Sequence, residues 1–397
     1  MNYKNVAIID IGSSSIKTFV INKENNISNI IGVGKSNTLG FNGNTIVDFD
    51  IFVDSIKKSI DKAQRQLSHK INDIILLSPS SQNKNFLISE KIILNGSQVE
   101  NNHLRQLFNS INNKYRSNIV HCFRSNFTTD QNIITDNPIG ITCNSLSLNA
   151  VATFISDSQL NLYKNIFSRV GVNIISIYDS SIIYYLYLKS LNLDKKNIVM
   201  IDIGFKSTKI IMIKDEKIAL IKTLPLGSQF ITTDFMKILN VSNDFAEKIK
   251  INHVDLDLIG ERSIEIPVWE ELGKNLKRKI EHDYLKSILS SRIDELFILI
   301  LNSISKSKFL YSYLLTGGGS MQLNLKPYLK KKFGIDVELA EPKPVTGIPT
   351  FWNNPSIMSI YTLNELITDG SLENLSILKK NDSFSNKIWY KRFVDLL

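Results

Sequence analysis

The sequence IDIGSSSIK at residues 9–17 returns as IDIGFKSTK at residues 201–209, and this pair decides the fold class. Each copy follows one apolar run and precedes another, so each predicts a strand, a tight turn and a second strand. The repeat predicts two related lobes that grip one ligand between similar hairpins. Four residue types recur in register, as Asp10 and Asp202, Gly12 and Gly204, Ser15 and Ser207, and Lys17 and Lys209.

The residue types in both hairpins are suited to binding phosphate. Glycine lets the backbone turn sharply, so that successive N–H groups point at one anion. Serine hydroxyls add donors, lysine adds a point charge, and the carboxylate of Asp10 can hold a hydrated Mg²⁺ that bridges phosphates. A single such turn is explained as well by a buried hairpin, but two copies favour a polyphosphate gripped from two sides. The predicted phosphate-binding residues are Asp10, Gly12, Ser13, Ser14, Ser15, Lys17, Asp202, Gly204, Ser207 and Thr208.

A third glycine-rich turn, TGGGS, lies at residues 316–320. It follows a strand-like run and precedes an amphipathic segment that extends towards Lys332. Taken alone, it reads as a flexible loop between a strand and a helix. After two phosphate-type hairpins, we expect Gly317, Gly318 and Gly319 to let the backbone approach the base, ribose or α-phosphate of a nucleotide.

Length and composition indicate a globular chain of more than one lobe. The 397 residues exceed one ordinary domain, and 43% are hydrophobic while 21% are charged. The net charge of +9 is spread along the chain apart from short basic groups at 277–279 and 330–332. These groups favour a solvated surface, so nucleic acid is not predicted as a partner.

Cysteines, histidines and the first residues predict a cytoplasmic protein without zinc. Cys122 and Cys143 form no CxxC pair, which favours a reducing compartment. The five histidines have no metal-ligand spacing. The start, MNYKNVAIID, contains no signal-peptide core, and no apolar run approaches the roughly 20 residues of a membrane-spanning helix.

The order of the three turns resembles the actin, Hsp70 and sugar-kinase superfamily and, within it, the bacterial cell-division protein FtsA. Four further segments are similar to FtsA at low identity and in the family's order. They are IGVGKSNTLGFNGNTIVD at 31–48, DNPIG at 136–140, PLGSQFITTDFMKILNVSNDFAEKIK at 225–250 and GIPTFWNNPSIMSIY at 347–361.

The resemblance implies an α/β, actin-like, two-lobed ATPase fold with duplicated RNase H-like cores, two inserted subdomains, and ATP with Mg²⁺ as ligands. It also implies that Glu247 and Lys250 contact the nucleoside. The first insertion would serve self-assembly and the second would dock FtsZ. The implied ranges are 1–80 with 163–196 for the first core, 81–162 for the first insertion, 197–229 with 306–366 for the second core, and 230–305 for the second insertion.

Two departures from the family pattern bear on ATP hydrolysis. Phe205 and Lys206 replace glycines, and a positive φ at Phe205 would cost about 1 kcal/mol or more. Lys206 and Lys209 either pair with phosphate or mark a second hairpin that grips less tightly. Asp10 and Asp179 are the candidate catalytic residues. Asp179 could orient an attacking water as a general base, but its position is explained equally well as the N-cap of a helix. We therefore expect nucleotide binding with at most slow hydrolysis.

The C-terminal segment predicts a membrane anchor. Residues 367–385 read as a polar linker, and 386–397 are predicted to form a short basic amphipathic helix. For an arbitrary protein such a helix would dock on the protein's own surface, but its place after a linker, as in FtsA, favours an anionic membrane. The predicted membrane-binding residues are Ile388, Trp389, Lys391, Arg392, Phe393, Leu396 and Leu397.

The leading functional hypothesis is an ATP-binding scaffold that polymerises on the cytoplasmic face of the inner membrane and tethers FtsZ filaments at the division septum. Its expected partners are the C-terminal peptide of FtsZ, further copies of itself, the anionic membrane surface and later division proteins. Two alternatives stay open. One is an FtsA-like ATPase of type IV pilus assembly, and the other is a small-molecule kinase of the same superfamily.

Overall fold

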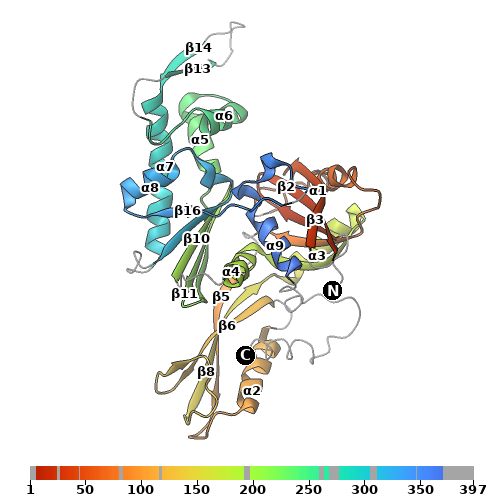
Figure 1. Cartoon of the computed structure of the whole chain (residues 1–397), viewed down its shortest axis with the longest axis vertical. Helices are drawn as coiled ribbons and strands as arrows, with labels where there is room; N and C mark the ends of the chain where they lie inside the picture. The colour runs from red at the N-terminus through yellow and green to blue at the C-terminus, as the bar shows by residue number, and fades with distance from the viewer. Residues whose placement is uncertain are drawn as a thin grey trace.

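The computed structural model describes residues 6–24, 27–43, 45–79, 84–115, 119–191, 197–258, 263–267, 277–304, 311–345 and 347–369. The expected amphipathic helix at 386–397 and nearly all of the expected linker lie outside these residues. The molecule is elongated, with two lobes side by side at its centre and a smaller part at each end of the long axis (Figure 1).

The first lobe contains a five-stranded sheet in the order β3-β2-β1-β4-β9. Its strands are β1 (Val6–Ile11), β2 (Ser15–Glu24), β3 (Ile27–Asn37), β4 (Asp73–Ser78) and β9 (Asn173–Asp179). Strands β1 to β3 are antiparallel, whereas β4 and β9 run parallel to β1. Apolar side chains on both faces of β1 are buried in two separate cores, so the sheet is packed on both sides.

The second lobe repeats this topology. Its sheet has the order β12-β11-β10-β15-β16, with the same antiparallel hairpin followed by two parallel strands. Its strands are β10 (Asn197–Ile203), β11 (Thr208–Lys214), β12 (Lys217–Leu224), β15 (Ser312–Thr316) and β16 (Val337–Leu339). The predicted duplication of a mixed α/β core is therefore confirmed.

Two helices lie between the sheets and join the lobes. They are α4 (Ser180–Ser190) and α9 (Met358–Thr368), which pack against each other. Ile360 and Leu363 of α9 pack in the core of the first sheet, whereas Tyr361 packs with α4 in the core of the second. The outer face of the first sheet is covered by α1 (Phe49–Gln64) and α3 (Asp157–Val170).

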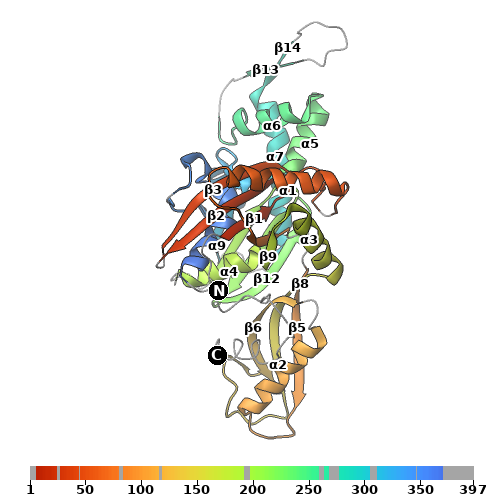
Figure 2. The same cartoon turned by 90° about the vertical axis from the view of Figure 1, so that its right-hand side faces the viewer.

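The first inserted part has a sheet and core of its own at one end of the molecule (Figure 2). The sheet order is β5-β8-β6-β7, and α2 covers one face. The elements are β5 (Lys84–Ile93), α2 (Asn101–Tyr115), β6 (Ile119–Thr129), β7 (Ile134–Thr135) and β8 (Ser145–Phe154). Since Ile155 and Tyr163 pack in the first lobe, α3 belongs wholly to that lobe, and the insertion ends before the expected residue 162.

His121 of the first inserted part packs against the first lobe and bonds to it. The ring of His121, from β6, stacks on Tyr178 with 5.5 Å between centroids. Burial lowers the pKa of His121 to about 4, although the nearby Asp179 opposes this shift. The neutral ring accepts a hydrogen bond at Nε2 from the Asp179 backbone N–H, at 3.3 Å.

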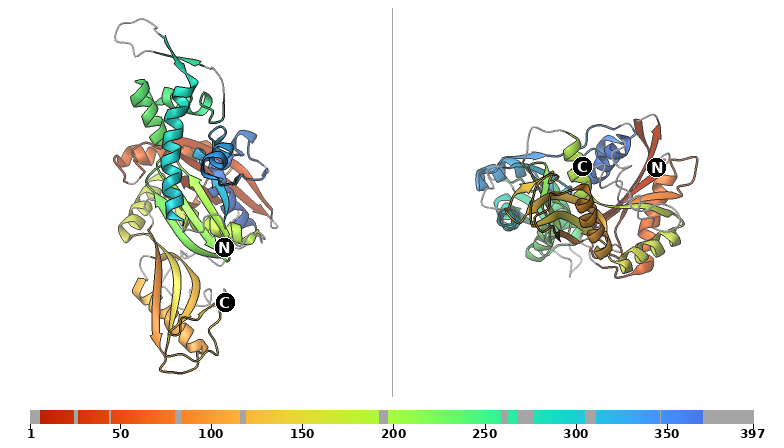
Figure 3. Two further views of the ribbon diagram at one scale, coloured as in Figure 1. Left: turned by 90° about the vertical axis from the view of Figure 1, so that its left-hand side faces the viewer. Right: turned by 90° about the horizontal axis from the view of Figure 1, so that it is seen from below.

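The second inserted part is mostly helical and shares the core of the second lobe. The hairpin of β13 and β14 lies at this end of the molecule. The long helix α7 runs from this hairpin down one face of the second sheet (Figure 3). Leu285 and Phe297 of α7 pack in the same core as Ile201 of β10. The elements on this side are α5 (Ser228–Leu239), α6 (Asn243–Asn252), β13 (Ser263–Pro267), β14 (Lys277–Glu281), α7 (His282–Ser303) and α8 (Leu325–Phe333).

Among the helices of the described residues, none combines the length and the apolar character that crossing a bilayer requires.

Candidate functional site

The two repeated hairpins have the same local geometry. Asp10 lies opposite Lys17 in one and Asp202 opposite Lys209 in the other. The N–H of Gly12 donates to the Ser15 carbonyl at 3.1 Å, and that of Gly204 donates to the Ser207 carbonyl at 2.9 Å. A Cβ on either glycine would lie 2.8 Å from that serine oxygen. Glycine is therefore required at both positions because the backbone of the serine approaches closely. The tips of both turns line the cavity between the lobes.

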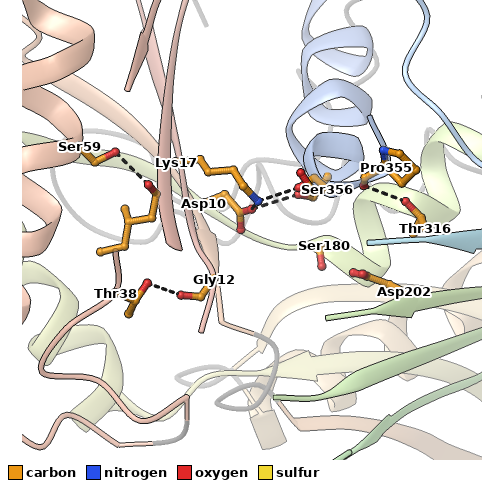
Figure 4. A network of polar contacts seen from close by, with 12 residues as sticks. Asp10, Gly12, Lys17, Thr38, Ser59, Ser180, Asp202, Thr316, Pro355 and Ser356 are labelled. Atoms are coloured by element: carbon orange, nitrogen blue, oxygen red, sulfur yellow. Dashed lines mark hydrogen bonds and ion pairs between the residues drawn. The ribbon is translucent and has the colours of Figure 1, made fainter. Parts of the chain in front are cut away.

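The first hairpin is completed by a segment more than 300 residues away in sequence. Lys17 Nζ donates to the Ser356 carbonyl at 2.7 Å and lies 3.7 Å from the Asp10 carboxylate. The hydroxyl of Ser359 donates to Asp10 at 3.4 Å. Figure 4 shows Lys17 between Asp10 and Ser356. Sequence reasoning missed both serines, although they lie in the segment at 347–361 that resembles FtsA.

The second hairpin is completed by side chains of helix α4, one of the two helices that join the lobes. Lys209 Nζ donates to Ser180 Oγ, and the Tyr184 hydroxyl donates to Asp202 at 3.3 Å. Burial raises the pKa of Asp202, an effect that Lys209 partly opposes. Burial and the carboxylates of Asp202 and Asp10 raise the pKa of Tyr184. Tyr184 therefore keeps its proton and remains a donor, a role that no local sequence signal revealed.

The glycine loop after β15 packs directly on the second hairpin. Gly317 has φ +82°, and a Cβ there would lie 2.3 Å from Asp202 Oδ1 and 2.6 Å from the Ile203 carbonyl. The Gly317 N–H and the Thr316 hydroxyl both donate to the Pro355 carbonyl at 3.2 Å. The loop thus packs on Asp202 and is also bonded to Pro355, next to Ser356, the residue that accepts the hydrogen bond from Lys17.

An ion pair between a buried lysine and a partly exposed glutamate lies where α5 meets α6. Lys250 Nζ donates to Glu247 Oε2 at 2.7 Å, to Thr232 Oγ1 at 2.9 Å and to the Ser228 carbonyl at 3.3 Å. Burial lowers the pKa of Lys250, and Glu247 opposes that shift. Arg292 adds a second cation here, with its guanidinium 5.8 Å from the Phe230 ring and two hydrogen bonds to Asp234. Apolar side chains flank this end of the site, namely Ile251, Ile293, Leu296, Phe297, Met321 and Leu325.

These groups line one cavity of about 860 Å³ between the lobes. The predicted residues that line it are Asp10, Gly12, Ser13, Ser14, Ser15, Lys17, Asp202, Gly204, Ser207, Glu247, Lys250 and Gly317 to Gly319. The cationic residues in its lining are Lys17, Lys35, Lys206, Lys209, Lys250 and Arg292, against the carboxylates Asp10, Asp202 and Glu247. Cations therefore predominate, which suits an anionic ligand.

Two predicted residues do not line the cavity. Thr208 is buried and its hydroxyl donates to the Leu226 carbonyl at 2.7 Å, so it is a structural residue of β11. Asp179 is fully buried, and its carboxylate accepts the Ser181 N–H at 2.8 Å as the N-cap of α4. The geometry of Asp179 is that of the helix cap which the sequence left open as an alternative to a general base.

Phe205 carries none of the backbone strain that a positive φ would impose. It is absent from the positive-φ residues among those described. Its carbonyl accepts the Gln229 N–H at 2.7 Å, next to the bond from the Ser228 N–H to the Gly204 carbonyl. The second hairpin therefore keeps its turn and rests on the first turn of α5.

Two related five-stranded sheets, each with such a hairpin facing a shared cavity, define the actin-like ATPase fold. The solved PilM–PilN type IV pilus biogenesis complex aligns with a TM-score of 0.63 at 12% identity, over 91% of this chain and 98% of that chain. MreB5 of Spiroplasma citri bound to ADP aligns with a TM-score of 0.56 at 11% identity, over 94% and 99% of the two chains. At these identities the similarity establishes the fold.

Within this class the chain is similar to cell division protein FtsA. The family model described as cell division protein FtsA matches residues 199–361. Cell division protein FtsA of Staphylococcus epidermidis is 25% identical over 396 residues, covering 96% of this chain and 83% of that protein. That of Bacillus subtilis is 26% identical over 363 residues, covering 84% and 78%. The predicted resemblance to FtsA is confirmed.

Proposed function

We propose that the chain binds ATP with Mg²⁺ in the cavity between its lobes. The observation that carries the proposal is the convergence there of both hairpins and the Gly317 loop, which are far apart in sequence. A volume of about 860 Å³ suits a cofactor, since such sites usually measure roughly 300–1,000 Å³. The excess of cations in the lining matches the negative charge of a polyphosphate.

The residues present fit the parts of the ligand. The hydroxyls of the two turns at 12–15 and 204–207, with the backbone N–H groups that the turns do not use themselves, would hold the polyphosphate together with Lys17. Asp10, at the end of β1, would hold Mg²⁺ through water. The apolar end near Glu247 and Lys250 would take the nucleoside, with the Gly317 loop against the ribose or α-phosphate.

Hydrolysis in this site is proposed to be slow. Asp179 caps α4 and does not line the cavity, which argues against its role as a general base. Asp10 remains the proposed catalytic carboxylate, and it already has Lys17 as a neighbour at 3.7 Å. ATP would then act chiefly as a ligand that favours one arrangement of the lobes through its differential affinity.

At the cellular level, we propose an actin-like division protein that polymerises on the inner membrane and tethers FtsZ filaments at the septum. Similarity to FtsA over most of the chain supports this role. In the first inserted part, β5 is an edge strand whose Leu87 and Ile93 are 69% and 70% exposed, which suits contact with another copy. The second inserted part would dock the C-terminal peptide of FtsZ, and the anchor would be residues 386–397.

Type IV pilus assembly is the second candidate, favoured by the structural similarity to the PilM–PilN complex. That similarity comes with 12% identity, whereas the sequence relatives at 25% and 26% are named cell division protein FtsA. Cell division is therefore the better-supported proposal. A small-molecule kinase would need a carboxylate base facing its substrate; Asp179 is engaged as a helix cap, and Asp10 is the proposed ligand of Mg²⁺ through water.

Liposome co-sedimentation tests the proposal with one preparation of the full chain. Anionic vesicles should retain the protein, ATP with Mg²⁺ should increase retention, and FtsZ should sediment only when the protein is present. A variant that ends at residue 385 should release both proteins, and uncharged vesicles serve as the control. Retention of the shortened variant would contradict the anchor. Phosphorylation of a sugar or polyol by the protein would contradict the scaffold role.

A further inference from the structure

The second phosphate hairpin reaches across the cavity through one residue, Lys206. Its backbone N–H donates to Ser13 Oγ at 3.2 Å, and its Nζ donates to the Asn42 carbonyl at 2.6 Å. Ser13 and Asn42 both belong to the first lobe, whereas Lys206 belongs to the second. One residue therefore bonds to both the first hairpin and the loop beside it.

The loop that receives Lys206 is held against the first hairpin. Thr38 donates its N–H to the Ser14 carbonyl at 3.1 Å and its hydroxyl to the Gly12 carbonyl at 2.7 Å. Phe41 is buried and stacks on Phe52 of α1, with 5.1 Å between ring centroids. The Asn42 carbonyl is therefore held in place by the core of the first lobe.

The stem of Lys206 also fits closely against this loop. Gly43 has φ +93°, and a Cβ there would lie 2.8 Å from Lys206 Cδ and 3.4 Å from Ser13 Cβ. Any larger residue would displace the lysine stem. The loop thus offers both a carbonyl for the ammonium group and a surface for the methylene groups.

The contact is asymmetric, because the first hairpin has a serine at the matching position. When Asp10 is aligned with Asp202, Ser14 aligns with Lys206. A serine side chain is too short to span the cavity. The duplication therefore explains the two turns, whereas at this aligned position the second hairpin has a side chain that reaches the other lobe and the first has a serine.

We infer that Lys206 is a positioning residue that clasps the second hairpin to residues 38–43 and so sets the separation of the two phosphate hairpins. Its effect on nucleotide affinity rests on the proposed ATP site. A clasp that holds both turns in register lowers the cost of ordering them around a polyphosphate. The clasp itself requires no nucleotide, and it can be tested without one.

Hydrogen–deuterium exchange of the full chain without nucleotide tests the clasp. In Lys206→Ala, peptides covering 36–43 and 204–209 should exchange several-fold faster, because the ammonium contact with the Asn42 carbonyl and the packing of the stem on Gly43 are lost, while the backbone bond to Ser13 remains. Lys206→Arg should restore slow exchange, since arginine also reaches a carbonyl. Lys222→Ala is the matched control, because its ammonium donates to Ser303 within the second lobe at 3.0 Å. Unchanged exchange in Lys206→Ala would overturn the inference.

Calorimetric titration of the same variants with ATP and with ADP separates the clasp from direct phosphate binding. Loss of the clasp should weaken both affinities about fivefold to tenfold, which is within the usual net value of one hydrogen bond. Weaker binding with unchanged exchange would instead make Lys206 a direct phosphate ligand and contradict the clasp. If the wild-type chain binds neither nucleotide, the proposed ATP site fails while the exchange experiment still decides the clasp.

Discussion

Gly317 and Gly318 are adjacent in one loop, but their surroundings differ. Gly317 has φ +82° and ψ 166°, a backbone conformation that is essentially restricted to glycine. A Cβ there would also lie 2.3 Å from the carboxylate of Asp202. At Gly318 the nearest atom to a Cβ is Ser356 Cβ at 3.9 Å, which is ordinary contact. The loop therefore needs glycine at the first position by both conformation and space.

Gly317→Ala should lower the free energy of unfolding by about 2 kcal/mol, a typical cost for a residue forced into such a conformation. It should also abolish nucleotide binding, because the displaced Asp202 belongs to the site. Gly318→Ala is the matched control and should change stability by less than about 0.5 kcal/mol. Urea denaturation of the three proteins measures the difference. Equal losses in both variants would show that the loop is not packed as described.

At the scale of secondary structure, the junction of β9 and α4 depends on Asp179. The carboxylate accepts the Ser181 N–H at 2.8 Å and so satisfies a backbone donor that the helix leaves unpaired. The following helix lies between the lobes, and its Ser180 and Tyr184 contact Lys209 and Asp202. The cap therefore positions two side chains of the candidate site indirectly.

Substitution of Asp179 distinguishes a cap from a general base. Asp179→Ala should lower the free energy of unfolding by about 1–2 kcal/mol, the usual cost of losing an N-cap. Asp179→Asn should cost far less, since asparagine also caps helices, and any slow ATP hydrolysis should persist in it. Thermal unfolding and phosphate release from the purified variants provide the two measurements. Loss of hydrolysis in the asparagine variant at unchanged stability would restore Asp179 as the base.

At the scale of the whole molecule, the two sheets face each other across α4 and α9. Helix α9 contributes Ile360 and Leu363 to one core and Tyr361 to the other. The cavity lies beside this connection, and its lining comes from both lobes. A ligand that contacts both hairpins therefore stabilises one arrangement of the lobes over others.

ATP with Mg²⁺ should stabilise the folded chain by mass action. At one hundred times its dissociation constant, the gain in unfolding free energy should be about 2.7 kcal/mol. Asp10→Ala should remove most of this gain, because the proposed Mg²⁺ ligand is lost. Thermal unfolding with and without ATP checks the expectation, with Lys222→Ala as a control outside the cavity. An equal shift in Asp10→Ala would place the nucleotide elsewhere.

Sequence patterns determined the elements whose geometry is local. A glycine between two apolar runs encodes a strand, a turn and a strand, so the duplicated hairpins of Asp10 and Asp202 and the duplicated α/β core were predictable from the repeat. The glycine loop at 317–319 was predictable from three successive glycines after an apolar run. Whether these residues bind nucleotide stays a prediction, and the expected anchor at 386–397 lies outside the described residues.

Tertiary structure alone decided which distant side chains complete the site. Ser356 and Tyr184 reach the hairpins because α4 and α9 cross between the sheets, and Lys206 spans the cavity because the turns face each other. It also decided that Asp179 caps a helix and that Thr208 is buried. Contacts between segments far apart in sequence depend on how two lobes pack, and a local pattern carries no record of that packing. The repeat therefore determined the two hairpins, while the packing of the lobes determined how unequal they are.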